Sequence, residues 1–197
     1  MKTKLMFELK RKAVHILALL FLAIYIIVRR YSGKGIALLS LTLILILFLI
    51  LDYFRIIRKK KIPFFHIFWR ESERSRLGGN VYFIMGTVVS FAIFDFWIAL
   101  TALLMTVFGD TAAALFGIKF GKIFLKSNKN KTWEGATAEL VVNLLIGLLL
   151  LHNLAVAIGM ALAATLVETF FTKVDDNFAV PIISGFIGEL LNLVIRL

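Results

Sequence analysis

The sequence predicts an all-α membrane protein, a polytopic bundle of about seven transmembrane helices. Of its 197 residues, 60% are hydrophobic, and the mean hydropathy is +0.92, whereas soluble globular chains are about 45–50% apolar. The apolar residues form long runs without the alternation of barrel strands, so helices are the expected spanning element. Seven helices of about 20 residues would occupy about 140 positions. We therefore expect a single integral-membrane domain over residues 1–197.

Seven apolar runs account for the expected helices, and each is about long enough to cross ~30 Å of hydrocarbon, the fifth only marginally. The first run is longer than the apolar region of a secretory signal peptide and lacks a small-residue cleavage site, so we expect it to be retained. The runs are Ala13–Val28, Gly35–Leu51, Gly79–Phe94, Trp97–Phe116, Ala136–Leu151, Asn153–Phe171 and Ala179–Ile195.

The charges predict which ends of these helices lie together. The chain has 23 Lys and Arg against 12 Asp and Glu, a formal net charge of +11. If the chain crosses at every run, nineteen basic residues fall on one side and four on the other, and the positive-inside rule assigns the richer side to the cytoplasm. We therefore expect a multi-pass protein of the cell membrane with its polar face in the cytoplasm and no nucleic-acid partner. The absence of cysteine excludes disulfides, thiolate metal sites and cysteine nucleophiles.

The segment from Gly109 to Gly135 carries the most informative polar pattern. Asp110 is followed on the same helix face by four small residues, so one carboxylate stands beside about three turns almost without side chains. Such a stripe is typical of close helix packing, but it also suits a groove where a polyphosphate approaches the backbone and Asp110 holds Mg²⁺. The small residues are Ala113, Ala114, Gly117 and Gly121.

A row of lysines follows the small residues and favours the phosphate-binding interpretation. The row ends in K-T-W-E-G at Lys131–Gly135, which opens the fifth expected helix. Thr132 is a good N-cap, and a helix N-terminus preceded by a lysine suits an anion. The lysines are Lys119, Lys122, Lys126, Lys129 and Lys131.

Three further carboxylates, Glu139, Glu168 and Glu189, lie within or at the ends of expected spans. Because a charge at the bilayer centre costs about 2.5–3.5 kcal/mol, we expect them to face the bundle interior. Interhelical hydrogen bonding explains all three, and a functional role is an equal alternative for Glu168.

The D-D-N segment, Asp175–Asn177, precedes Pro181 at the start of the last expected run. Asn177 or Asp176 as N-cap, with proline early in the helix, accounts for the pattern structurally. The alternative is that the two adjacent acids supply a second set of metal ligands.

Near the N-terminus, Glu8, Lys12 and His15 share one helix face. An ordinary ion pair and a structural histidine explain this face, and a catalytic or phosphate-facing role is the alternative.

Together these segments resemble the integral-membrane family of dolichol (polyprenol) kinases and phytol kinases, which is related to phosphatidate cytidylyltransferases. The matching pieces occur in order over nearly the whole chain, although Gly79–Asn80 stands where relatives tend to have Gly-Ala or Gly-Thr. They are E-x-x-R-K-x-x-H from Glu8, R-E-S-E-R-S-R-L-G-G-N-V-Y-F from Arg70, G-D-T-A-A-A-L-F-G-I-K-F-G-K from Gly109, K-T-W-E-G from Lys131 and E-x6-D-D-N-x3-P from Glu168.

The resemblance implies a CTP-dependent kinase that uses Mg²⁺ to phosphorylate the hydroxyl of a long-chain isoprenoid alcohol of the polyprenol or dolichol type. The alternatives are a cytidylyltransferase that forms a CDP-lipid, a CTP-dependent diacylglycerol kinase and a small transporter. Transporters usually have paired repeats and midplane polar groups, which this sequence does not show. Small-residue faces also suit contact between copies of the chain, so a homo-oligomer is among the expected assemblies.

The resemblance also implies roles for individual residues. Catalysis would depend on Asp110, with His15 or Asp176 as the group that accepts the hydroxyl proton. Mg²⁺ would be held by Asp110, Asp175 and Asp176. Nucleotide and phosphate contacts would come from Arg11, Lys12, Gly117, Gly121, Lys122, Lys131, Thr132, Glu134 and Asn177.

Overall fold

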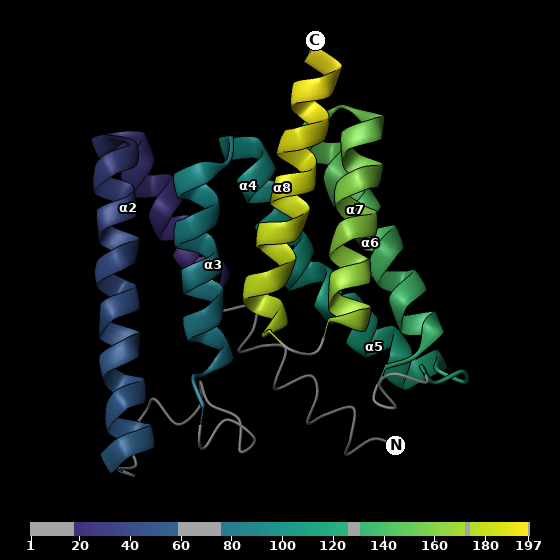
Figure 1. The fold of residues 1–197 in the computed structure, drawn as a ribbon, viewed down its shortest axis with the longest axis horizontal. Helices are drawn as coiled ribbons and strands as arrows, with labels where there is room; N and C mark the ends of the chain where they lie inside the picture. Colours follow the sequence, from purple (N-terminus) through teal and green to yellow (C-terminus); the bar gives the residue numbers. More distant parts are fainter. Residues whose placement is uncertain (1–17, 59–75, 126–130, 172–173, 197) are drawn as a thin grey trace.

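A computed structural model describes residues 18–58, 76–125, 131–171 and 174–196. Within these segments every named element is a helix (Figure 1), which confirms the all-α class. The N-terminal motif with Arg11, Lys12 and His15 lies outside the described residues, as do Lys126 and Lys129.

The described helices follow the expected apolar runs. Four stretches are long and apolar enough to cross a membrane, namely Leu19–Ile57, Phe96–Phe120, Trp133–Leu151 and Asp176–Ile195. Two shorter apolar helices, α3 and α7, accompany them, so the total of seven spans stays a prediction. The elements are α2 (Leu19–Arg58), α3 (Gly79–Ile93), α4 (Phe96–Leu104), the π-helical turn η3 (Met105–Gly109), α5 (Asp110–Phe120), α6 (Trp133–Leu151), α7 (Leu154–Phe170) and α8 (Asp176–Arg196).

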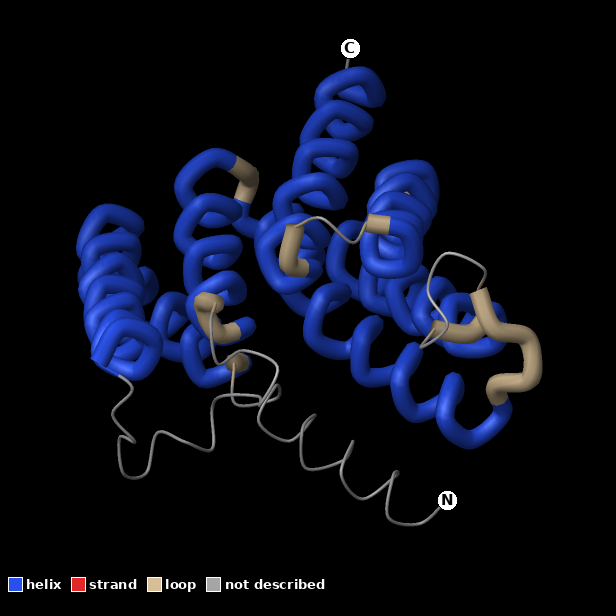
Figure 2. Tube along the Cα trace, turned by 60° about the horizontal axis from the view of Figure 1, so that its bottom comes forward, coloured by secondary structure: helices blue, strands red, loops and turns tan. Residues whose placement is uncertain are grey.

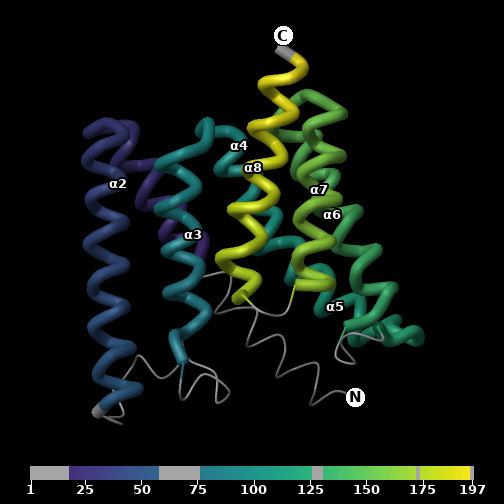
Figure 3. The backbone as a smooth tube through the Cα atoms, viewed as in Figure 1, coloured from purple at the N-terminus to yellow at the C-terminus, as the bar shows by residue number. Residues whose placement is uncertain are grey.

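Gly33 divides α2 into two parts that correspond to the first two expected runs. Its φ of 86° and ψ of 170° are non-helical, and a positive φ is readily adopted by glycine because it lacks Cβ. Figure 3 shows the chain reversing direction there, between the purple and blue parts. Lys34 Nζ donates to the Ala92 carbonyl at 3.2 Å, and the Arg29 guanidinium lies 4.3 Å from the Phe96 ring centroid. These contacts hold the reversal against the turn between α3 and α4.

The fourth expected run, Trp97–Phe116, is not one straight α-helix, because η3 interrupts it between Leu104 and Asp110. A Cβ at Gly109 would approach Asn143 Cγ and Nδ2 to 3.1 Å, so α6 lies directly against this turn. Short π-helical segments often occur at functional sites. The turn places Asp110 at the first position of α5.

The turns of the bundle alternate between its two ends. The α3–α4 and α6–α7 turns lie at the upper end in Figure 1, together with the Gly33 reversal. At the opposite end α2 and α7 finish, α3 and α8 begin, and α5 meets α6; we call this the site end. Figure 2 brings the site end forward and shows α5 lying across it. The tan loop at the right of the picture follows α5 in the chain. Which side of a membrane the site end faces stays a prediction.

Close contact between α3 and α8 fixes the start of α8 at the site end. A Cβ at Gly86 would lie 2.9 Å from the Asn177 carbonyl oxygen and 3.1 Å from Pro181 Cγ, so this position of α3 leaves no space for a side chain. Elsewhere α8 packs against α4 and α7, and α6 packs between α5 and α7. The first residues of α8 are therefore held directly against α3.

Candidate active site

Thr132 caps α6, as the sequence predicts. Its hydroxyl oxygen accepts the Gly135 N–H at 3.2 Å. Before the cap, Phe124 and Thr132 form an isolated antiparallel bridge. Beside it the Leu125 N–H donates to the Lys131 carbonyl at 2.9 Å and the Trp133 N–H donates to the Ile123 carbonyl at 3.0 Å. These bonds fix the backbone of Lys131 at the entrance of α6.

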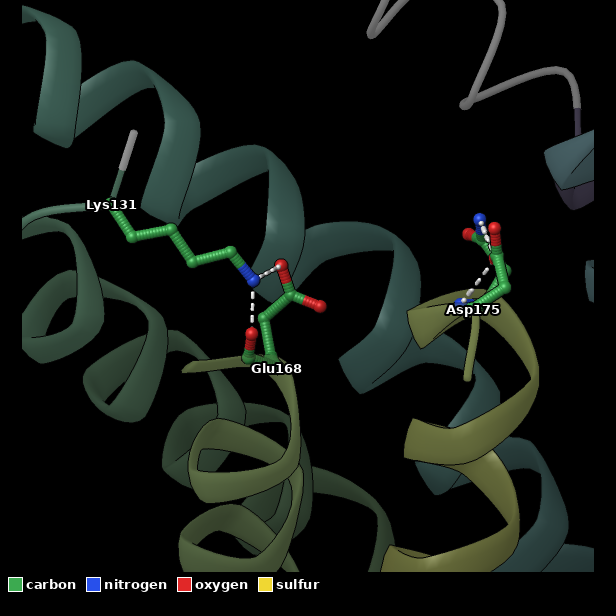
Figure 4. A network of polar contacts seen from close by, with 4 residues as sticks. Lys131, Glu168 and Asp175 are labelled. Atoms are coloured by element: carbon green, nitrogen blue, oxygen red, sulfur yellow. Dashed lines mark hydrogen bonds and ion pairs between the residues drawn. The ribbon is translucent and has the colours of Figure 1, made fainter. Parts of the chain in front are cut away.

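The Lys131 side chain reaches from the residue before the α6 cap to the last turn of α7 (Figure 4). Its Nζ forms an ion pair with Glu168 Oε1 at 3.0 Å and also donates to the Glu168 backbone carbonyl. The Glu168 side chain is 7% exposed and the Lys131 side chain 29%. The final carbonyls of a helix lack intrahelical partners and carry partial negative charge. The end of α7 therefore binds the ammonium group through both its backbone and its side chain.

Two further acids, Asp110 and Asp176, lie close enough to act on the charge of Lys131. Burial by itself lowers the pKa of Lys131, but the attraction of Glu168, Asp176 and Asp110 outweighs burial and raises the pKa above its usual value. Lys131 is therefore an ammonium group throughout the physiological pH range. Asp110 lies where η3 continues into α5, Lys131 directly precedes the cap of α6, and Asp176 lies in the first turn of α8.

A buried polar row continues from this cluster into the bundle along α6. Glu139 is 2% exposed and interacts electrostatically with Asp110, Glu168 and Lys131. Asn143 bonds the Glu139 carboxylate and donates from Nδ2 to Thr165 Oγ1 at 3.2 Å, while its Oδ1 meets no hydrogen-bond partner among the described residues. The expectation that Glu139 and Glu168 face the interior is thus confirmed.

The donor set of this cluster suits Mg²⁺. Asp110, Glu168 and Asp176 act electrostatically on the Lys131 ammonium, and all of their ligand atoms are oxygen. Mg²⁺ usually takes one or two carboxylates together with substrate phosphates and water. Among the described residues no three acidic or histidine side chains converge on a common metal position. The assignment of Asp110, Asp175 and Asp176 as metal ligands stays a prediction.

Asp175 caps α8, which corrects the expectation that Asp176 or Asn177 does so. Asp175 Oδ1 accepts the Asn177 N–H at 3.1 Å and Asn177 Nδ2 at 2.9 Å. The cap therefore lies one residue earlier than expected and uses the carboxylate of Asp175. In Figure 4 this pair stands apart from the Lys131–Glu168 pair. Asp176, in the first turn of α8, is the acid of this segment that acts on Lys131.

The glycines of the small-residue stripe lie where α5 and α6 touch. A Cβ at Gly117 would lie 3.0 Å from Thr132 Oγ1, and a Cβ at Gly121 would lie at the same distance from that atom. A Cβ at Gly135 would lie 2.7 Å from the Ala113 carbonyl oxygen. Close helix packing accounts for these glycines, and their approach to a phosphate stays a prediction.

Glu134 connects the end of α5 to the start of α6. Its Oε1 accepts the backbone N–H groups of Lys122 at 3.0 Å and Ile123 at 3.2 Å, while the Lys122 side chain is exposed. Glu134 thus stabilises the turn that leads towards Lys131. Nucleotide contacts by Glu134, Lys122, Thr132 and Asn177 stay predictions.

The sequence did not specify the pairing of Lys131 with Glu168. Both members of the pair are visible as polar residues at helix ends, but they are 37 residues apart. The available signal was their expected position on the same side of the membrane.

Comparison with known proteins finds relatives that are named as lipid kinases. The chain is 30% identical over 141 residues to "Probable phytol kinase, chloroplastic" of Triticum aestivum, an alignment that covers 62% of this chain and 47% of that protein. It is 28% identical over 146 residues to "CTP-dependent diacylglycerol kinase 1" of Saccharomyces cerevisiae, covering 70% and 48% respectively. An uncharacterized protein of Rickettsia prowazekii is 30% identical over 191 residues, covering 89% of this chain and 90% of that protein.

No family model and no solved structure matches the chain. The alignments with the wheat and yeast proteins span about half the length of those relatives. They confirm the resemblance carried by the motifs: the chain is similar to proteins named phytol kinase and CTP-dependent diacylglycerol kinase, which are members of the CTP-dependent lipid kinase family.

Proposed function

We propose that the chain transfers the γ-phosphoryl group of CTP to the hydroxyl of a long-chain isoprenoid alcohol. The supporting observation is that Asp110 of α5 and Asp176 of α8 both act electrostatically on Lys131, which precedes α6. A cation beside two carboxylates suits a nucleoside triphosphate with its divalent ion. The names of the wheat and yeast relatives give the reaction class, and phytol is itself an isoprenoid alcohol.

Phosphoryl transfer depends mainly on positioning and on neutralisation of phosphate charge. The Lys131 ammonium would bind the triphosphate oxygens, and Asp110 and Asp176 would hold Mg²⁺. Mg²⁺, when bound, supplies further positive charge to the phosphate oxygens. The lipid oxygen forms a bond to the γ-phosphorus as the bond to the β–γ bridging oxygen breaks, and CDP leaves.

The acceptor hydroxyl loses its proton in this step, and Asp176 or His15 accepts it. Asp176 is half-buried in the first turn of α8, next to the end of α7. A carboxylate at this position is able to orient the hydroxyl towards the γ-phosphate.

Exposed aromatic side chains beside the ion pair suit the hydrocarbon part of a lipid substrate. Trp133 and Phe170 each follow a member of the Lys131–Glu168 pair by two positions. They are 51% and 46% exposed, and their rings contact edge to face with centroids 6.3 Å apart. We place the lipid chain along this pair, with its hydroxyl at the polar cluster and the site end at the cytoplasmic face of the cell membrane.

The test is a transfer assay with the purified protein in lipid nanodiscs. CTP labelled at the γ-phosphate and Mg²⁺ are supplied with phytol, a polyprenol, dolichol or diacylglycerol. We expect a labelled isoprenoid monophosphate and CDP, and no product with labelled ATP. Pyrophosphate with a CDP-lipid would instead show a cytidylyltransferase, and no product with any acceptor would refute lipid kinase activity.

A CTP-dependent diacylglycerol kinase is the second candidate, because the yeast relative of that name aligns with 70% of this chain. Label that appears only in phosphatidic acid would establish it and overturn the isoprenoid acceptor.

A further inference from the structure

We propose that Glu168 is a positioning residue, which holds the Lys131 ammonium where the triphosphate binds. The catalytic consequence rests on the function proposed above, whereas the holding contact rests on the structure alone. The carboxylate and the backbone carbonyl of Glu168 both accept from Lys131 Nζ. Two acceptors on one residue define the direction as well as the position of the ammonium group.

Lys131 requires such a partner because its side chain is long and flexible. A lysine side chain carries about 2 kcal/mol of rotamer entropy, and Lys131 enters the site from a turn rather than from a helix. Glu168, in contrast, belongs to the last turn of α7 and its side chain is 7% exposed. The better-fixed residue therefore sets the position of the more mobile one.

The surrounding charges give the contact a second effect. Asp110 and Asp176 attract the ammonium as well. Without the two acceptors on Glu168, the ammonium would be drawn towards these acids, which we assign to Mg²⁺. Glu168 keeps the cation of the site separate from the carboxylates that bind the metal.

The holding contact is measured first by chemical labelling, which needs neither CTP nor activity. The full chain in detergent micelles is treated with acetic anhydride between pH 7 and 10, and acetylation of Lys131 and of exposed Lys119 is quantified by mass spectrometry. We expect Lys131 to react more slowly than Lys119. Glu168→Gln removes the largest of the attractions that raise the pKa of Lys131, so the pKa falls although Asp110 and Asp176 remain. Each unit of this fall raises the neutral fraction of Lys131 about tenfold. Unchanged Lys131 labelling in this variant would overturn the proposal.

The second measurement is a double-mutant cycle on the dissociation constant of CTP with Mg²⁺, which inactive variants also report. If Glu168 acts through Lys131, the Lys131→Met, Glu168→Gln double variant binds CTP no more weakly than Lys131→Met alone. The matched control is Thr165→Val, one turn earlier in α7, where the side chain bonds Asn143. Its effect should be additive with Lys131→Met.

If the effects of Glu168→Gln and Lys131→Met on CTP binding are additive, Glu168 has a merely structural role and the inference is overturned. The proposed kinase function would still stand. If wild-type protein neither binds CTP nor transfers phosphate, the proposed function fails and the labelling still decides the contact. Should Glu168→Gln not fold, Glu168→Asp retains the charge at shorter reach. It should give Lys131 labelling faster than in the wild type, and unchanged labelling would again refute the contact.

Discussion

Replacing Gly135 by alanine tests how closely α5 and α6 approach each other beneath Lys131. A Cβ added at Gly135 would lie 2.7 Å from the Ala113 carbonyl oxygen and 3.4 Å from Gly117 Cα. Both contacts are backbone atoms of α5, which no side-chain rotation can move. The two helices must therefore separate by several tenths of an ångström to accept the methyl group.

The expected cost combines two opposing effects. Alanine is favoured over glycine inside a helix by about 1 kcal/mol, whereas overpacking a close contact costs about 1–3 kcal/mol. Because the Gly135 contact is with backbone, we take the upper part of that range and expect a net loss of about 1–2 kcal/mol in the free energy of unfolding. Separation of α5 from α6 also shifts Thr132, so transfer activity should fall as well.

Gly35→Ala is the matched control, since a Cβ there would meet no atom within 4 Å. It should stabilise α2 by up to about 1 kcal/mol. Both variants are compared with the wild type by denaturant unfolding in detergent micelles, followed by intrinsic fluorescence. A Gly135→Ala protein as stable as Gly35→Ala would refute the close α5–α6 contact.

Three further outcomes are expected. Asp110→Asn should lower phosphate transfer from CTP by at least about a hundredfold, because it removes a carboxylate assigned to Mg²⁺; an unchanged helical circular dichroism spectrum with full activity would contradict that assignment. Asp175→Ala should cost about 1 kcal/mol through loss of the α8 cap, whereas Asp176→Ala should leave the cap bonds to Asn177 intact, so equal losses in unfolding experiments would count against the cap. The folded-state pKa of Lys131 lies above its ordinary 10.5, so the stability from its pair with Glu168 is present below pH 10.5 and is lost as pH rises through the higher folded value. The unfolding temperature of the wild type should therefore fall over that alkaline range by more than that of Lys131→Met.

The sequence predicted the helices well because long apolar runs bounded by charge leave few alternatives. It did not predict η3, because the residues of Met105–Gly109 resemble those of the neighbouring helices. The wider π-helical turn depends on how α6 packs against Gly109, which the sequence does not show. The cap of α8 was misplaced because three successive side chains, Asp175–Asn177, are all good N-caps. Choosing among them requires the hydrogen bonds that tertiary structure fixes.

The candidate site was predictable as separate parts. Asp110, Lys131 and Asp176 were each chosen from local pattern, and the structure brings them within electrostatic reach of one another. Local pattern also gathered Lys119 and Lys122 into the same row as Lys131, but both are exposed. Lys131 differs from these two lysines because it has a partner, Glu168 of α7. That partner is distant in sequence, so no local pattern indicates it.

Stability alone does not explain why this cluster carries so much buried charge. Replacing a buried ion pair by apolar groups of similar volume is often neutral or stabilising, and interhelical contact at a helix end needs no ammonium. The pair of Lys131 and Glu168, with Asp110 and Asp176 nearby, is therefore a costly arrangement for joining α6 to α7. The Lys131→Met, Glu168→Gln variant separates the two explanations, because it removes both charges together. A protein that keeps its unfolding temperature but no longer transfers phosphate assigns these charges to catalysis. Loss of stability with activity retained would assign them to the fold.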